Sequence, residues 1–345
     1  MHILCDISHP AHVHFFRNAI DTWRTRGHKV TIAARDKDIT LTLLDEYGYE
    51  YECLSQMRRG LIGLGLELLE HEGRLYKQSW RNPPDVFLEI GGTFIVHAAK
   101  LLRRPAIVFY DTEHAFVSNT ITYPFASAVC TPACYQGDIG PKHVRYEGYH
   151  ELAYLHPNWF KPNPEVLTEI GLKPDEPLFV TRFVGWEASH DVAQKGFSLA
   201  GKIKLVRALE RYGRVIITSE ADLPAELQPY QMRIAASKIH HLLAFATLYI
   251  GESATMASES VVLGTPAIFV SPVGRGYTDE QENEYDMCYT ISDKEEEKAI
   301  AKALELVQCQ NLKTEWAEKR RQLLAKKIDV TTWMVDFVEE FVEAH

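Results

Sequence analysis

A loop near the start of the chain gathers histidines at the end of an apolar run. His9, His12 and His14 follow directly on residues 1–6, MHILCD. Imidazole changes charge near neutral pH, so His9 or His12 could take a proton from a substrate hydroxyl as a general base. His12 and His14 diverge on a helix, which disfavours a metal site. The alternative is structural, with Ser8 capping the next helix and the histidines bonding locally.

A second polar group ends a later apolar run, where Asp111-Thr112-Glu113-His114 follows the residues AIVFY. Two carboxylates and an imidazole at such a position could carry out general acid–base catalysis. Asp111 and Glu113 are therefore candidate catalytic residues. The competing interpretation is that Asp111 or Thr112 only caps the helix that follows.

The pair Gly91-Gly92 follows the apolar run VFLEI and precedes a helical pattern. Glycine adopts positive φ and lets another group approach the backbone closely. The spacing matches neither G-x-G-x-x-G nor the P-loop pattern, which argues against an ordinary dinucleotide or P-loop site. A tight strand-to-helix turn explains the pair equally well.

The segment IGESATMASE in the second half is the strongest candidate for a phosphate site. A strand pattern ends there and a helix begins, so Ser253, Ala254 and Thr255 would leave backbone amides open to phosphate oxygens. Glu259, one turn further, could accept hydrogen bonds from a ribose diol. The structural alternatives make Ser253 a helix cap and Glu259 a solvated surface residue. Arg182, in the segment TRFVGW, could present its guanidinium to phosphate or lie on the surface.

These positions fall at the ends of apolar runs that alternate with helical periodicity. In the first half we expect strands at 1–6, 29–34, 49–54, 85–90 and 106–110, with helices at 13–26, 39–47, 61–80 and 94–102. In the second half we expect strands at 178–181, 214–219, 248–251 and 267–270, with helices at 197–212, 240–246 and 256–263. This alternation predicts parallel sheets with helices on both faces. Ligands of such sheets bind beyond the carboxyl ends of the strands.

The alternation breaks at 149–164, a stretch that contains several prolines and aromatic residues. We therefore expect a Rossmann-like domain at 1–155, a second Rossmann-like domain at 156–329, and a C-terminal helix at 330–345 that packs back on the first domain. Two such sheets would face each other across a cleft that holds the ligand.

The 345 residues are 46% hydrophobic and 24% charged, which is typical of a globular protein. A net charge of −10 argues against general nucleic-acid binding, although it allows a local basic pocket. The sequence has no basic start and no run of about 18 apolar residues, so we expect no signal peptide, no spanning helix and a cytoplasmic location. The six scattered cysteines suggest no metal site, and Cys5 and Cys53 are expected in the core.

Two segments, PDVFLEIGGTFIVHAAKLLRRPAIVFYDTEH and GESATMASESVVLGTPAIF, resemble parts of GT-B glycosyltransferases and of the related non-hydrolysing UDP-N-acetylglucosamine 2-epimerases. The whole chain, including DISHPAHVHFFRNAI, resembles the domain-of-unknown-function-354 group of that superfamily. The resemblance implies a GT-B fold with an acceptor-side first domain and a nucleotide-sugar-binding second domain.

The resemblance also implies roles for individual residues. Phosphate would be bound by Ser253 and Thr255, and the ribose by Glu259. Glu113 aligns with a catalytic glutamate of the epimerases. The donor sugar and the cleft would be contacted by Gly91, Gly92, Gln281 and Asn283.

The implied activity is metal-independent transfer from a nucleotide-activated sugar, in particular a UDP-sugar, to a sugar or lipid-linked acceptor in glycan or glycolipid biosynthesis, with no cofactor. A nucleotide-sugar 2-epimerase or hydrolase is the first alternative, although the chain lacks the Asp-Thr-Thr-Thr and His-Arg-Arg-Glu-Asn motifs of the epimerases. A non-catalytic subunit that binds a nucleotide sugar is the second alternative.

The expected helix at 61–80 begins with the unusually apolar residues LIGLGL. Cationic residues lie near it, namely Arg58, Arg59, Arg74, Lys77 and Arg81. An apolar face flanked by cations can rest on an anionic membrane surface, here the inner face. Packing of the same face against the first sheet is the simpler explanation.

Overall fold

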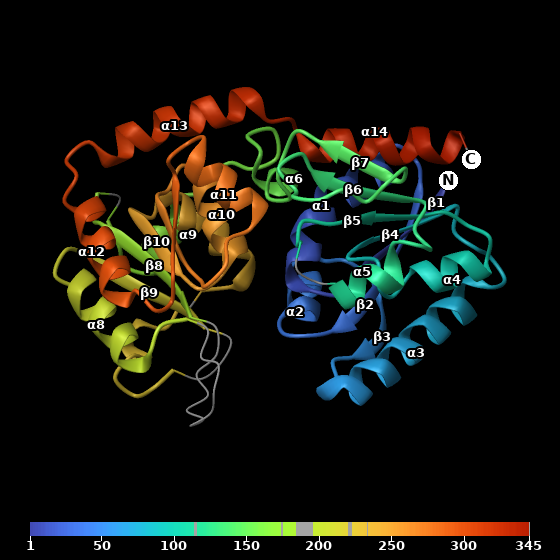
Figure 1. Cartoon of the computed structure of the whole chain (residues 1–345), viewed down its shortest axis with the longest axis horizontal. Helices are drawn as coiled ribbons and strands as arrows, with labels where there is room; N and C mark the ends of the chain where they lie inside the picture. The colour runs from blue at the N-terminus through green and yellow to red at the C-terminus, as the bar shows by residue number, and fades with distance from the viewer. Residues whose placement is uncertain (114–115, 174, 184–195, 220–222, 233, 345) are drawn as a thin grey trace. The chain divides into compact units, whose positions relative to one another are not determined.

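The computed structural model of the protein describes residues 1–113, 116–173, 175–183, 196–219, 223–232 and 234–344 (Figure 1). The chain divides into two compact units. Unit 1 contains Met1–Trp159 and Ile328–His345, and unit 2 contains Phe160–Lys327. Unit 2 is therefore inserted into unit 1, whose last helix comes from the C-terminal segment. Each unit contains its own parallel sheet, which confirms the predicted α/β fold class.

The sheet of unit 1 has the strand order β3-β2-β1-β4-β5-β6-β7, and every neighbouring pair is parallel. Its strands are β1 (His2–Ile7), β2 (Lys29–Asp36), β3 (Glu52–Gln56), β4 (Val86–Ile90), β5 (Ala106–Phe109), β6 (Ala128–Pro132) and β7 (His143–Tyr146). Because β1, β4 and β5 are neighbours, the loops that follow them leave the same edge of the sheet.

Helices cover both faces of this sheet, as right-handed crossovers between parallel strands require. They are α1 (Pro10–Thr25), α2 (Thr40–Glu46), α3 (Gly60–Ser79), α4 (Val96–Leu101), α5 (Phe116–Thr122), α6 (Leu152–Leu155) and α14 (Val330–Glu343). α1 packs against β1, β2, α6 and α14, whereas α4 packs against β4, β5 and α3. In α1 the buried residues Val13, Phe16, Ile20 and Trp23 recur at intervals of three and four, which gives the helix one apolar face.

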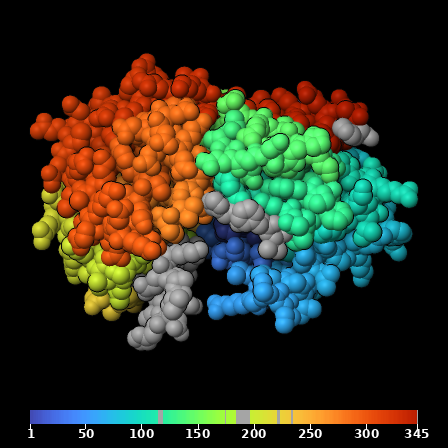
Figure 2. Space-filling view, in the orientation of Figure 1, coloured from blue at the N-terminus to red at the C-terminus, as the bar shows by residue number. Residues whose placement is uncertain are grey.

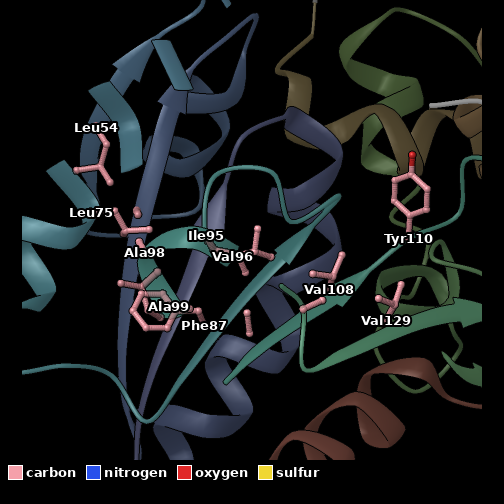
Figure 3. Close-up of a cluster of buried hydrophobic side chains, with 14 of the residues drawn as sticks. Leu54, Leu75, Phe87, Ile95, Val96, Ala98, Ala99, Val108, Tyr110 and Val129 are labelled. Atoms are coloured by element: carbon pink, nitrogen blue, oxygen red, sulfur yellow. The ribbon is translucent and has the colours of Figure 1, made fainter. Parts of the chain in front are cut away.

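A hydrophobic cluster fills the space between the sheet of unit 1 and α3 and α4 (Figure 3). Leu54, Phe87 and Val108 enter it from three strands, Leu75 from α3 and Ala99 from α4, and each is at most 1% exposed. Full burial of a large apolar side chain contributes about 1.5–3 kcal/mol. The cluster therefore fixes the strand ends from which the candidate loops project.

The sheet of unit 2 has the parallel order β12-β11-β10-β8-β9. Its strands are β8 (Leu178–Phe183), β9 (Arg214–Ser219), β10 (Leu248–Gly251), β11 (Ala267–Val270) and β12 (Cys288–Ile291). Its helices are α7 (Glu165–Glu169), α8 (Leu199–Leu209), α9 (Ile239–Phe245), α10 (Ala254–Leu263), α11 (Gly276–Asn283), α12 (Glu296–Val307) and α13 (Leu312–Lys326), with short 3₁₀ turns at Gln228–Tyr230 and Ala236–Lys238. The neighbouring strands β8 and β10 direct their carboxyl ends to one edge.

Three strands and one cysteine differ from the expectations. β6, β7 and β12 were not predicted. Cys5 is buried as expected, but Cys53 is exposed because β3 is the edge strand of its sheet.

Two features are absent from the described residues: a membrane-spanning helix and a metal-binding cluster. No helix among them combines the length and the apolarity needed to cross a bilayer. No group of three His, Cys, Asp or Glu side chains among them has the arrangement of a metal site.

Candidate functional site

The carboxyl edge of the unit 1 sheet brings together residues that are far apart in the sequence. β1 leads into the histidine loop, β4 into the glycine pair and β5 into Asp111. The register pairs Asp6 of β1 with Glu89 of β4, so two carboxyl groups lie on neighbouring strand ends. Both are buried, at 0% and 1% exposure.

His9 and His12 occupy different positions at the start of α1. His9 is the N-cap, and its Nδ1 accepts a hydrogen bond from the Ala11 amide at 3.2 Å. The alternative that Ser8 caps this helix is therefore wrong. His12 is buried inside the first turn, with its ring centroid 5.9 Å from that of His9.

His12 is linked to a buried carboxyl group through Ser8. The Ser8 hydroxyl donates to Glu89 Oε1 at 3.0 Å and lies 3.3 Å from His12 Nδ1, and the Ser8 backbone N–H is also 3.3 Å from that nitrogen. The second Glu89 oxygen accepts from the Phe94 amide at 3.0 Å. The Ser8 backbone N–H donates to Nδ1, so in this arrangement Nδ1 carries the lone pair and the neutral ring has its hydrogen on Nε2. In the other tautomer Nδ1–H would donate to the Ser8 hydroxyl oxygen, and Nε2 would carry the lone pair that a general base needs.

Burial shifts both ends of this chain toward their neutral forms. Burial, together with the charges of His9, His150 and Lys37, lowers the pKa of His12 well below its ordinary value of 6.5, against the opposing effect of Asp111. Burial and then the charge of Asp6 raise the pKa of Glu89 well above its ordinary value of 4.5. A neutral imidazole is the form that accepts a proton.

Asp111 is paired with a histidine from the end of unit 1's first segment. Its Oδ2 lies 3.3 Å from His150 Nδ1, and its Oδ1 accepts from the Thr112 hydroxyl at 3.0 Å. Burial raises the pKa of Asp111, but His150 and Thr112 outweigh burial and hold the pKa below its ordinary value of 3.8. Asp111 is thus a carboxylate that acts electrostatically on both His12 and His150.

The other predicted residues of unit 1 lie around this cluster. Glu113 is half-buried, and its Oε1 accepts from the Gln136 amide at 3.3 Å. Gly91 and Gly92 have φ of 85° and 73°, as a tight turn requires. A Cβ on Gly92 would lie 2.4 Å from Val108, whereas one on Gly91 would meet nothing within 4 Å. Packing therefore requires glycine at 92, and the open side of the turn is at 91. His114 lies outside the described residues.

Two members of this cluster, Glu89 and His150, were not among the predicted site residues. A signal for Glu89 was present, since an acidic residue ends the otherwise apolar strand VFLEI. His150 lies in the irregular segment after β7, where no periodic pattern marks a position near the sheet edge.

In unit 2 the predicted phosphate segment forms the start of α10. Ser253 is the N-cap, and its hydroxyl accepts from the Met256 amide at 3.3 Å. Ala254 and Thr255 are half-buried, and in the described part of the chain their backbone amides have no acceptor. The helix start therefore combines a fixed cap with two amides that can meet an anion.

Glu259 is not on a solvated helix face, so that structural alternative is wrong. The residue is 4% exposed, and its Oε1 lies 2.9 Å from Nε2 of the buried His240 on α9.

Gln281 and Asn283 differ in their surroundings, although both belong to α11. Gln281 is fully buried, and its Nε2 donates to the Ser258 hydroxyl on α10 at 2.7 Å. Its Oε1 is buried and has no partner among the described residues. Asn283 is exposed at the last position of the helix.

Arg182 lies near the carboxyl end of β8, beside Gly251 of β10. Its carbonyl accepts from the Glu252 amide at 2.9 Å, and its side chain is half-buried. Glu252 Oε1 accepts from the Phe197 amide at 2.8 Å and is 3.4 Å from Lys202 Nζ. Residues 184–195, which follow β8, lie outside the described residues.

One protein family matches nearly the whole chain. The family model described as "Protein of unknown function (DUF354)" matches residues 1–343. A relative in Methanocaldococcus jannaschii, the uncharacterized protein MJ0665, is 22% identical over 283 residues, which cover 77% of this chain and 81% of the relative.

Two solved structures, one of an epimerase and one of a glycosyltransferase, have a similar fold. A UDP-GlcNAc 2-epimerase from Neisseria meningitidis, bound to UDP-GlcNAc, matches with a TM-score of 0.67 and 9% identity over 100% of both chains. The glycosyltransferase VinC, in complex with DTDP, matches with a TM-score of 0.64 and 12% identity over 100% of both chains. These likenesses, together with the two parallel sheets, show the predicted GT-B fold.

Proposed function

We propose that this chain, which belongs to the family described as protein of unknown function DUF354, is a glycosyltransferase that uses a nucleotide-activated sugar, specifically a UDP-sugar. The proposal rests on the residues around His12 in unit 1 and on the start of α10 in unit 2. The observation that carries the proposal is the start of α10, where the Ala254 and Thr255 amides follow a capping serine on a fold whose solved relatives hold UDP-GlcNAc or DTDP.

The donor diphosphate would be bound at this helix start. Two backbone amides, the helix dipole and the Thr255 hydroxyl favour phosphate oxygens, and Arg182 near the neighbouring strand end would add a fixed positive charge. These groups can stabilise the charge that develops on the leaving diphosphate without a metal ion. Chelation of divalent cations should therefore leave the activity unchanged.

Within the same proposal, His12 takes the proton from the acceptor hydroxyl. Ser8 and Glu89 orient its ring through Nδ1, and Asp111 stabilises the imidazolium that forms. Ring burial keeps His12 neutral before the reaction, which is the state a general base needs. Glu113 and His9, beside this group, would contact the acceptor, which we propose is a sugar or a lipid-linked sugar.

Isothermal calorimetry with UDP, GDP and dTDP tests the donor assignment. We expect UDP to bind most tightly and Ser253→Ala with Thr255→Val to weaken binding by about tenfold, since one charge-assisted hydrogen bond contributes about 1.5–3 kcal/mol. The matched control is Ser271→Ala, whose hydroxyl, within the described part of the chain, forms hydrogen bonds to Val273 in the loop after β11. Absence of binding by all three nucleotides would reject the nucleotide-sugar proposal.

Epimerisation is the second candidate, because a UDP-GlcNAc 2-epimerase shares the fold. Incubation of UDP-N-acetylhexosamines with the protein alone distinguishes the two reactions. An isomerised sugar nucleotide formed without any acceptor would favour epimerisation, and released free sugar would favour hydrolysis. Tight nucleotide binding with neither product, with or without acceptors, would instead indicate a non-catalytic nucleotide-sugar-binding subunit.

A further inference from the structure

α3 is held in the fold by two buried polar side chains from its middle. Glu67 accepts from Arg35 Nε at 2.5 Å, from Arg35 Nη2 at 2.9 Å and from the Arg58 amide at 2.9 Å. One turn later, His71 Nε2 lies 2.7 Å from Asp6 Oδ2 and its Nδ1 lies 2.7 Å from the Ser55 hydroxyl. These contacts fix which face of α3 meets the sheet.

The same contacts leave the apolar residues of the first turns outside. Leu61 is 90% exposed and Ile62 is 82% exposed, and Leu64, Leu66 and Leu69 are 45–70% exposed. Packing of these residues against the sheet, the simpler expectation from the sequence, is therefore wrong. In Figure 2 the light-blue segment that contains α3 forms part of the surface of unit 1.

Cationic side chains border this apolar surface. Arg59 precedes the helix, Lys77 lies in its last turn and Arg81 follows it, and all three are exposed and have no ion pair in the described part of the chain. The acidic residues of α3 are less available, because each already has a partner. Glu67 is buried against Arg35, Glu70 bonds both Arg58 and Arg74, and Glu72 bonds His97.

We propose that the start of α3 is a membrane-docking surface, in which Leu61, Ile62, Leu64, Leu66 and Leu69 enter the headgroup region of an anionic lipid bilayer and the bordering cations bind lipid phosphates. No described helix can span a bilayer, so the contact is interfacial. A helix with one apolar face and cations beside it is the type that binds such surfaces.

Two observations favour a bilayer over a second copy of the chain. Exposed apolar side chains continue from Leu61 to Leu69, with Arg59 before this stretch and Lys77 after it, which is the arrangement of a helix that lies in the plane of an anionic interface. A two-fold contact between copies would also place the same cations on both sides of the interface. Lipid phosphates give every one of these cations an opposite charge.

Vesicle flotation tests the proposal on the full chain, and it does not depend on any transferase activity. We expect the protein to float with phosphatidylcholine vesicles that contain about 30% phosphatidylglycerol, to bind pure phosphatidylcholine about tenfold more weakly, and to be released by about 1 M NaCl. The double variant Leu61→Glu with Ile62→Glu should lower the partition coefficient at least about tenfold. The matched control is Leu199→Glu with Val273→Glu, two exposed apolar residues of unit 2.

Circular dichroism should show the same fold in the parent and both double variants, because all four side chains are exposed. No flotation of the parent protein would overturn the proposal. Equal flotation of the Leu61/Ile62 variant would overturn it too, because these two apolar side chains would then not contribute to membrane binding. Light scattering without lipid adds a third outcome: a dimer that this variant dissociates would assign the surface to a second copy.

Discussion

At the residue scale, Glu89 makes the pH dependence of folding testable. Its pKa lies well above 4.5 in the folded protein because of burial and the nearby Asp6. Above pH 4.5 the unfolded chain therefore releases a proton that the folded state retains, so this residue reduces stability as the pH rises. Glu89→Gln removes that effect. In urea unfolding from about pH 5 to 8, the unfolding free energy of the variant relative to that of the parent should rise with pH, by at most about 1.4 kcal/mol per pH unit.

A difference between parent and variant that stays constant across this range would mean that Glu89 is ionised in the folded state. The direct loss of a carboxylate oxygen at the Phe94 amide affects both ends of the range equally. The informative quantity is therefore the change with pH of the difference in unfolding free energy between variant and parent, and not the size of that difference at one pH.

His12 should be required for turnover but not for donor binding. Loss of a general base lowers kcat by about 10²–10⁴-fold. We expect this from His12→Asn, with UDP affinity unchanged. His97→Asn is the control, since His97 also bonds a glutamate, Glu72 at 2.7 Å, but lies on α4 and outside the cluster. Equal kcat values for parent and His12→Asn would exclude His12 as the base.

Glu259 should affect both folding and nucleotide binding. It shares a buried 2.9 Å hydrogen bond with His240, and a hydrogen bond to a charged group contributes about 1.5–3 kcal/mol. Glu259→Gln should therefore lower the unfolding free energy by about 1–2 kcal/mol. If the residue also binds the ribose, UDP affinity falls about tenfold or more. Thermal unfolding and calorimetry on one preparation separate the two effects, and unchanged affinity would leave Glu259 with a structural role only.

The residue types of the candidate site were predictable from the sequence, but their partners were not. Histidines and carboxylates after apolar runs mark the carboxyl edge of a sheet, which located His12 and Asp111. The orientation of Glu259 depends on how α10 is rotated against α9, and that rotation is set by tertiary packing. The Glu89–Ser8 contact joins positions 81 residues apart, and no local pattern encodes such a pairing.

At the element scale, α3 offers two glutamates for comparison. Glu67→Ala leaves Arg35, whose side chain is 11% exposed, without its charge partner, and breaking a buried pair in this way costs about 3–5 kcal/mol. Glu70→Ala removes two ion pairs with exposed arginines, and such pairs contribute at most about 1 kcal/mol each. Chemical denaturation should therefore give a much lower unfolding free energy for Glu67→Ala than for Glu70→Ala. Similar losses of unfolding free energy in the two variants would contradict the anchoring role of Glu67.

The unpredicted strands share a physical cause. β7 and β12 have four residues each and lie at sheet edges, where one partner strand suffices and neither a long apolar run nor strict alternation is needed. β6 is internal, but it ends at Pro132, a residue that is uncommon inside sheets. The other internal strands were found, even the four-residue strands β5, β10 and β11, because burial on both faces requires continuous apolar runs.

At the scale of the whole molecule, unit 1 depends on residues beyond unit 2. In α14, Val330, Met334, Val335 and Val338 are all 0% exposed, and together they contribute about 6–12 kcal/mol by burial. That range is comparable to the total stability of a domain, about 5–15 kcal/mol. Residues 1–159 alone should therefore show no cooperative thermal transition, whereas the same residues joined to 328–345 by a flexible linker should.

Calorimetry of both fragments checks this expectation, with residues 160–327 as the reference for unit 2. A cooperative transition of 1–159 at the same temperature with and without α14 would show that the helix only covers a unit that is already stable.

The insertion of unit 2 also sets an order of events during synthesis. Translation adds about 5–20 residues per second, so α14 leaves the ribosome on the order of 10–30 s after Trp159. Unit 2 has all its residues by then, while the first 159 residues still lack the helix that packs against α1 and α6. The earliest part of the chain is thus the last to mature, and a chaperone that binds nascent apolar surface should associate with it until α14 has emerged from the ribosome.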